Sequence, residues 1–188
     1  MANIAQLHRK ALEETRSVVA GIDRVQWANA TPCHGWDVQA LLNHLVSGNL
    51  WAAELGSGRT IEEVGNRLDG DVLGDSALAA YDTSAEVAEA TLEAPGALDA
   101  PCAVSYGPVP GAVYAGHRFV DVLIHGWDLA TATDQDATLD PELVDAAYNL
   151  LQDQAGMVRR SGMFGEDILV PAGVGPQTQL LAFIGRKG

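Results

Sequence analysis

The chain has 188 residues, of which 47% are hydrophobic and 19% are charged. These proportions are typical of a folded globular protein and exclude a disordered or fibrous one. The formal net charge is −14. Because an acidic surface repels phosphate backbones and anionic lipid headgroups, we expect neither nucleic-acid binding nor membrane binding.

Length, cysteine content and the first residues predict the number of domains and the compartment. A chain of this length is expected to fold as one domain over residues 1–188. No apolar run approaches the roughly 18 residues that would span a bilayer. Charges within MANIAQLHRKALEE argue against a signal peptide, and two cysteines are too few for a disulfide framework. These features together favour a cytoplasmic protein.

Helical periodicity divides the first half of the chain into long helices. We predict a first helix over residues 5–22, followed by a loop that ends in TPCHGWD. Asp37 is the expected N-cap of a second helix over residues 38–55, because its carboxylate can accept a hydrogen bond from an unpaired backbone N–H. Residues 56–74 are rich in Gly and Asp and predict a long connection with one helical turn. A third helix is expected over residues 76–92.

Prolines interrupt the chain after the third helix. Four of them lie between residues 95 and 110, so this segment cannot be helical throughout. We predict a loop there, with a short extended piece at residues 103–106. A fourth long helix is expected over residues 111–132.

The last part of the chain predicts additional helices. Asp140 and Pro141 mark the start of a fifth helix that reaches residue 160, because Asp caps a helix and Pro suits its first position. Residues 162–176 are expected to be irregular, and a short helix over residues 177–184 closes the chain. Four long helices with long crossover connections predict an all-α fold, a four-helix bundle with additional C-terminal helices.

The predicted fourth helix carries His117, Asp121 and His125 at intervals of four, within HRFVDVLIHGWD. Residues four apart lie on one helix face with Cβ atoms about 5–6 Å apart, so Asp121 and His125 can bind one cation. His44 lies in the middle of the second helix. Because a bundle brings mid-helix residues of different helices opposite one another, His44 can supply a third ligand.

Structural roles are the alternative interpretation of these residues. A lone histidine in a helix is more often a core or surface residue than a ligand, and an Asp–His pair four apart is more often solvated. Against this, Asp121 and His125 have apolar neighbours, namely Phe119, Val120, Val122, Leu123, Ile124 and Trp127. An unpaired charge among such neighbours is costly and needs a partner or a metal. Periodicity alone leaves both interpretations open.

Three segments, TPCHGWDVQALLNHL, HRFVDVLIHGWDLATAT and QTQLLAFIGRKG, resemble the DinB-like, mycothiol-dependent maleylpyruvate isomerase family. The resemblance covers nearly the whole chain and implies a four-helix bundle. It also implies metal ligands at His44, Asp121 and His125. The chain departs from the isomerases in having Asp121 where they have Glu, and a chain ending at Gly188 has no room for their additional C-terminal domain. The substrate can therefore not be transferred from the family.

Two imidazoles and one carboxylate leave at least one position of a metal open, which is typical of catalytic zinc sites. The donor types favour zinc, although nickel, iron or manganese could bind the same donors. The resemblance implies that the metal activates a low-molecular-weight thiol, mycothiol, which attacks an electrophilic carbon. We therefore predict a thiol transferase or isomerase. A metal-dependent hydrolase that activates water and a non-catalytic metal-binding stress protein are the alternatives.

Two further residues of the fourth helix are candidates for catalytic roles. Asp128, three residues after His125, could orient an imidazole by accepting its second N–H, or it could cap or form an ion pair at the helix end. His117 could be a fourth ligand, a general base or an ordinary polar residue. The expected partner is a small-molecule substrate, and a homodimer formed through helix faces is an alternative to a monomer.

We expect structural or surface roles for the remaining histidines and for the two cysteines. Cys33 lies several residues before the second helix, outside the spacing of the ligands, and we expect a buried structural thiol. Cys102, in the proline-rich loop, receives the same interpretation. His8 and His34 are expected to face solvent, whereas Trp36 is expected in the core or in a pocket wall.

Overall fold

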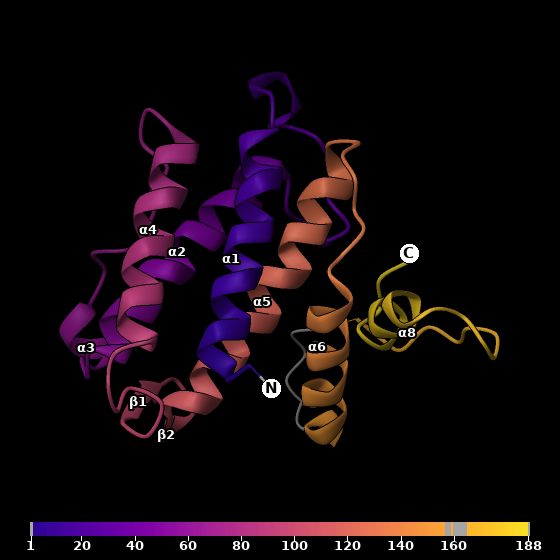
Figure 1. Cartoon of the computed structure of the whole chain (residues 1–188). Helices are drawn as coiled ribbons and strands as arrows, with labels where there is room; N and C mark the ends of the chain where they lie inside the picture. The colour runs from indigo at the N-terminus through magenta and orange to yellow at the C-terminus, as the bar shows by residue number, and fades with distance from the viewer. Residues whose placement is uncertain (1, 157–158, 160–164, 188) are drawn as a thin grey trace. The chain divides into compact units, whose positions relative to one another are not determined.

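The computed structural model describes residues 2–156, 159 and 165–187 (Figure 1). The chain divides into two compact units, one that extends through Ala137 and one that begins at Thr138. The expectation of one domain stays a prediction, because the compactness of each unit does not decide whether either folds alone.

Four long helices form the first unit and confirm the predicted bundle. They are α1 (Ile4–Ala20), α2 (Val38–Gly56), α4 (Ala77–Leu92) and α5 (Gly111–Ala132). The α5 helix packs against α1 and α2, and α4 packs against the same two helices. Each helix of the bundle therefore borders two others, as Figure 1 lets the reader follow.

Polar side chains fix where three of these helices begin. Asn3, Asp37 and Ser76 each accept a hydrogen bond from a backbone N–H in the first turn of the following helix. The prediction of Asp37 as the N-cap of α2 is confirmed. A cap of this kind stabilises a helix by about 1 kcal/mol, so the start of α2, six residues before His44, is well defined.

Short elements occupy the connections between the long helices. A 3₁₀ turn, η1 (Arg24–Gln26), follows α1, and α3 (Ile61–Val64) is the helical turn predicted after α2. An antiparallel hairpin of β1 (Pro101–Val104) and β2 (Gly107–Pro110) precedes α5. It replaces the single extended piece that the sequence predicts at residues 103–106.

Proline content conceals this hairpin in the sequence. Pro101 pairs with Pro110 and Pro108 pairs with Ala103. A sheet of two strands leaves one edge of each strand without a partner strand, and proline is tolerated at such edges because it has no N–H to donate. The prolines therefore exclude a helix here but not a strand.

The buried face of α1 includes a histidine. Its buried residues follow the helical period, being Ala5, His8, Ala11, Leu12, Thr15 and Val19. The prediction that His8 faces solvent is therefore wrong, and its side chain is fully buried. Leu7 and Val18 of the same helix, although hydrophobic, are only partly buried.

The second unit contains α6 (Pro141–Asp153) and α8 (Pro176–Phe183), which pack together. Asp140 caps α6 by accepting from the N–H of Glu142, and Pro141 occupies its first turn, as predicted. The irregular stretch predicted before α8 is observed over residues 165–175, and residues 162–164 lie outside the described residues.

The fifth helix is shorter than the sequence predicts. It ends at Asp153, where Gln154 is the C-cap, rather than at residue 160. Residues 157–158 and 160 of the predicted span lie outside the described part of the chain. No helix among the described residues is both long and apolar enough to cross a bilayer.

Candidate metal centre

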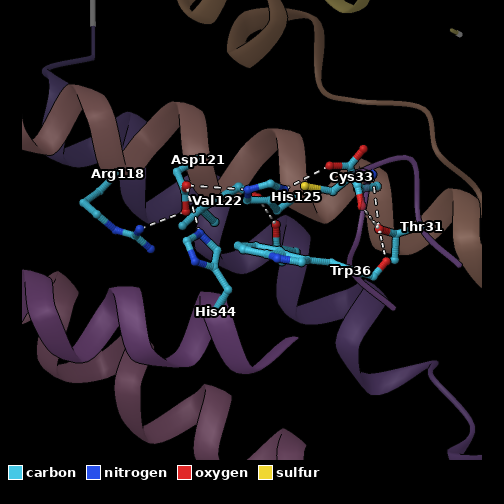
Figure 2. Close-up of polar contacts among 10 residues, drawn as sticks. Thr31, Cys33, Trp36, His44, Arg118, Asp121, Val122 and His125 are labelled. Atoms are coloured by element: carbon cyan, nitrogen blue, oxygen red, sulfur yellow. Dashed lines mark hydrogen bonds and ion pairs between the residues drawn. The ribbon is translucent and has the colours of Figure 1, made fainter. Parts of the chain in front are cut away.

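Three side chains from two helices of the bundle meet at one place (Figure 2). His44 comes from α2, whereas Asp121 and His125 lie one turn apart on α5. His44 Nε2 is 3.1 Å from Asp121 Oδ1, and His125 Nε2 is 3.6 Å from the same oxygen. One donor atom from each residue lies within 4.8 Å of the other two. The structure thus brings together the three predicted residues, while their role as metal ligands stays a prediction.

The two imidazoles are set at a steep angle beside an indole ring. The ring centroids of His44 and His125 are 5.1 Å apart, with planes at 86°. The centroid of Trp36 lies 4.7 Å from that of His44 and 5.9 Å from that of His125. The side chains of His44 and Asp121 are 33% and 26% exposed. The cluster is therefore partly exposed, with Trp36 beside both imidazoles.

The two carboxylate oxygens of Asp121 face different partners. Arg118 Nη1 donates a hydrogen bond to Oδ2 at 2.8 Å, whereas Oδ1 is the oxygen near the imidazoles. Burial would raise the pKa of Asp121, but Arg118, followed by His125 and His44, outweighs burial and holds that pKa well below its usual range. The carboxylate is therefore charged at neutral pH, which is the state that binds a metal.

Arg118 is a site residue that the sequence analysis does not identify. Its side chain is 8% exposed, and it lies three residues before Asp121 on α5. Opposite charges three apart on a helix are a recognised pairing signal. That spacing could have identified Arg118, although it does not reveal that the guanidinium turns into the bundle.

Asp128 contacts the second nitrogen of the His125 ring. Its Oδ2 lies 3.0 Å from His125 Nδ1, and the carboxylate is fully buried. A carboxylate oxygen accepts, so Nδ1 carries the proton and the lone pair of Nε2 points away from Asp128. This contact fits the predicted orienting role. The cap interpretation does not fit, because α5 continues to Ala132.

His117 lies one turn before Asp121 but outside the cluster of potential ligands. Its Nδ1 is 3.2 Å from the hydroxyl of Tyr106, which lies between β1 and β2. Neither group of potential metal ligands among the described residues includes His117. The structure therefore gives no support to the fourth-ligand interpretation, and a role as general base stays a prediction.

Cys33 differs from its predicted environment. It is only partly buried, and it forms a second group of potential ligands with His125 and Asp128, with one atom of each within 4.8 Å of the others. The prediction of a buried structural thiol is therefore wrong for this residue. Cys102 is 1% exposed, which agrees with the same prediction. His34 is exposed, as expected.

A polar turn brings Cys33 to this place. The hydroxyl of Thr31 donates to the carbonyl oxygen of Trp36 at 2.9 Å and accepts from the N–H of Cys33 at 3.1 Å. These bonds close the loop before α2 into a compact turn (Figure 2). Distance along the sequence is therefore a poor guide to where Cys33 lies.

Comparison with known proteins identifies relatives of this chain. A family model described as "Mycothiol maleylpyruvate isomerase N-terminal domain" matches residues 8–130, which include all three potential ligands. Two curated relatives from Mycobacterium tuberculosis are 34% identical over 95% of both chains: the uncharacterized protein MT0763 of strain CDC 1551 / Oshkosh and the uncharacterized protein Rv0738 of strain H37Rv.

Two solved structures share the fold. Mycothiol-dependent maleylpyruvate isomerase is 15% identical, with a TM-score of 0.61, over 84% of this chain and 72% of that chain. A histidine-to-alanine mutant of a protein with the same name is 14% identical, with a TM-score of 0.63, over 82% of this chain and 72% of that chain. At these identities the matches show the fold alone, and they confirm the predicted helical bundle.

Proposed function

Because the chain belongs to the mycothiol maleylpyruvate isomerase N-terminal domain family, we propose that it is a metal-dependent enzyme that acts with a low-molecular-weight thiol on a small electrophile. In the proposed reaction the thiol sulfur bonds to an electrophilic carbon of a double bond and the thiol proton goes to the neighbouring carbon, which gives an S-conjugate. Alternatively, the adduct rotates about the former double bond and expels the thiol, which gives an isomer. The observation that supports this proposal is the convergence of His44, Asp121 and His125 on one partly exposed place.

The donor atoms fit a divalent cation of the zinc type. Two donors that bind zinc at about 2.1 Å in a tetrahedral arrangement lie about 3.4 Å apart. The separations from Asp121 Oδ1 to the two imidazole nitrogens are 3.1 and 3.6 Å. Asp121 therefore reaches both histidines, even though the family pattern has the longer Glu at this position. Nickel, iron or manganese would suit the same donors.

The proposed chemistry divides between the metal and the side chains around it. A bound zinc ion lowers the pKa of a thiol or water that takes its remaining position. Asp128 holds the His125 ring with Nε2 directed to the cluster, and Arg118 holds Asp121. Trp36 shields one side of both imidazoles from bulk water. We propose mycothiol as the thiol, and the electrophile as a small molecule that approaches along Trp36.

Metal content tests the first half of the proposal. Protein purified without an affinity tag is analysed for metals beside the variants His44→Ala, Asp121→Ala and His125→Ala. Each variant should lose most of the metal that the wild type holds, since two remaining donors bind weakly. The control is His34→Ala, because His34 is exposed and outside the cluster. Wild-type protein without metal after loading and dialysis would overturn the proposal.

Thiol dependence tests the second half. Metal-loaded protein is mixed with a small thiol and a panel of activated alkenes and cis-unsaturated acids, and thiol loss and isomerisation are followed. We expect acceleration that requires both metal and thiol and that His44→Ala abolishes. Isomerisation without added thiol would contradict the thiol dependence, and metal-dependent cleavage of an ester or amide added to the panel would instead support a hydrolase. No acceleration for any compound would favour a non-catalytic metal-binding protein.

A further inference from the structure

We propose that Arg118 is a positioning residue that restricts Asp121 to one metal-binding oxygen and so keeps a position of the metal available to the thiol. This inference rests on the proposed function, because it assumes that the cluster of His44, Asp121 and His125 holds a metal. It concerns the number of protein donors rather than the reaction.

The two oxygens of Asp121 are already assigned to different partners. Oδ2 accepts from Arg118 Nη1 at 2.8 Å. Oδ1 lies 3.1 Å from His44 Nε2 and 3.6 Å from His125 Nε2. In Figure 2 Arg118 reaches the carboxylate from the left, His125 lies to its right and His44 lies below it. Oδ2 lies against a positive guanidinium, which disfavours a second cation there, so Oδ1 is the oxygen that faces a metal held by the imidazoles.

The number of carboxylate oxygens decides whether a small ligand can bind. With one oxygen from Asp121, the cluster supplies three donors, and a four-coordinate zinc ion keeps one position for an external ligand. With both oxygens, the cluster supplies four donors, and an added thiol must then bind as a fifth ligand or displace one of them. Acidic side chains bind metals in either mode, so a second contact is needed to select one of them.

A chain of buried hydrogen bonds holds Arg118 in place. Arg118 Nη2 donates to Asn49 Oδ1 at 3.2 Å, and Asn49 Nδ2 donates to Ser84 Oγ at 3.3 Å. Ser84 in turn donates to the carbonyl oxygen of Tyr81 at 2.9 Å. The bonds lead from α5 through α2 to α4, and all four residues are buried. A guanidinium tethered in this way has little freedom to leave Asp121.

A glycine makes room for the guanidinium. A Cβ atom added at Gly48 would lie 2.4 Å from Arg118 Nη1 and 2.7 Å from Cζ. Glycine inside a helix is unfavourable relative to alanine, yet α2 has glycine at this position. Gly48 therefore leaves the space that the Arg118 guanidinium occupies beside α2, and a methyl group there would displace the charged end without removing it.

A stabilising ion pair is the simpler explanation of the same contact. Buried ion pairs are weak evidence for stability, because removing two charges from water offsets their attraction. The two explanations differ in what they predict for a bound metal. An ion pair alone predicts the same coordination with or without Arg118, whereas the positioning role predicts a gain of one protein donor.

Cobalt substitution distinguishes them, because the visible absorption of Co²⁺ is several-fold stronger in four-coordinate than in five- or six-coordinate sites and so reports geometry. The proteins are wild type, Gly48→Ala, Arg118→Met and Arg118→Lys, each loaded with Co²⁺ and titrated with 2-mercaptoethanol. The matched control is Gly56→Ala, where an added Cβ on the same helix would meet Thr91 instead of Arg118.

We expect wild type and Gly56→Ala to share one spectrum and one thiol affinity. Gly48→Ala and Arg118→Met should change the cobalt spectrum and weaken the thiol-to-cobalt charge-transfer titration about tenfold, and Arg118→Lys should partly restore both. If Arg118→Met fails to fold, Gly48→Ala decides, because it keeps every charge. Unchanged spectra and thiol affinities in the folded variants would overturn the inference, as would complete loss of cobalt from them.

The wild-type protein alone tests the proposed function, separately from the variants. A wild-type protein that holds Co²⁺ but gives neither a thiol band nor thiol-dependent activity would refute the proposed function. In that case a spectral change in Gly48→Ala would still support the positioning role of Arg118. Failure of wild type to hold Co²⁺ would overturn both.

Discussion

Thr15 of α1 contacts Gly126 of α5 so closely that no side chain fits at position 126. An added Cβ would lie 2.2 Å from Thr15 Oγ1. The same hydroxyl donates to the carbonyl oxygen of Val122 at 3.1 Å. This contact fixes α1 against the segment of α5 that carries Asp121 and His125, so packing between these helices supports the candidate metal centre.

The variant Gly126→Ala should destabilise the protein. Overpacking of a buried contact typically costs about 1–3 kcal/mol, and urea denaturation measures the loss. Thr15→Ala removes the hydroxyl and the methyl group that the new Cβ would meet. The double variant should therefore be less unstable than the sum of the two single variants. If the stability loss of the double variant equals the sum of the two single losses to within about 0.5 kcal/mol, the clash with Thr15 is not the cause of the destabilisation.

The buried His8 should make the folded protein less stable in acid. Among the described residues, neither nitrogen of its ring has a hydrogen-bond partner. Burial, assisted by Arg118, lowers the pKa of His8 from 6.5 to about 3. The unfolded chain binds the proton near pH 6.5 and the folded chain does not. The free energy of unfolding should therefore decrease as pH falls from about 6.5 towards 3, by up to about 1.4 kcal/mol per pH unit for one proton.

The variant His8→Leu tests this dependence. It places no titrating group at this buried position, so its stability should decline less steeply over that pH range. Urea denaturation between pH 7 and pH 4.5, with a chelator present throughout, measures the slope. His34→Leu is the control and should keep the wild-type slope, because His34 is exposed. Equal slopes for wild type and His8→Leu would contradict the prediction.

Asp128 is expected to influence metal affinity without being a ligand in the proposed site. Loss of a carboxylate that orients a metal-binding histidine typically reduces metal affinity about 10–100-fold. Asp128→Asn keeps an acceptor oxygen for His125 Nδ1 but loses the charge, so its effect should be smaller than that of Asp128→Ala. Competition with a chromogenic chelator measures the affinities. Asp82→Asn, in an exposed pair with Arg16, is the control, and an equal loss there would refute the orienting role.

Cys33 tests which of the two groups holds the metal. Both groups contain His125, but only one contains Cys33. The proposed site requires Cys33→Ser to keep its metal, whereas His44→Ala loses it. Cadmium-loaded wild type should also lack the near-ultraviolet band of a cadmium–thiolate bond. The opposite pattern, with metal lost from Cys33→Ser and retained in His44→Ala, would place the ion beside Cys33.

The sequence predicts the bundle and the cluster because both follow from helical spacing. Asp121 and His125 lie one turn apart on any helix, and His44 needs only a bundle to face them. The caps at Asp37 and Asp140 set the helix starts, and the observed bounds of the four long helices agree with the predicted ones to within two residues.

Other features depend on contacts that spacing does not encode. His8 is buried because its position on α1 faces the core, although its side chain is polar. Cys33 reaches α5 through a turn closed by Thr31. Arg118 enters the bundle because Gly48 leaves space on another helix. Each case involves two distant segments, and periodicity within one segment cannot reveal it.

The indole of Trp36 gives the protein an intrinsic optical probe. Its ring centroid lies 4.7 Å from that of His44, a separation at which a paramagnetic ion held by that imidazole quenches indole emission. Titration with Co²⁺ or Ni²⁺ should dim the fluorescence of the native chain, and Trp36→Phe, which leaves Trp27, Trp51 and Trp127, should lose most of that change. Metal occupancy can thus be followed in solution without any label.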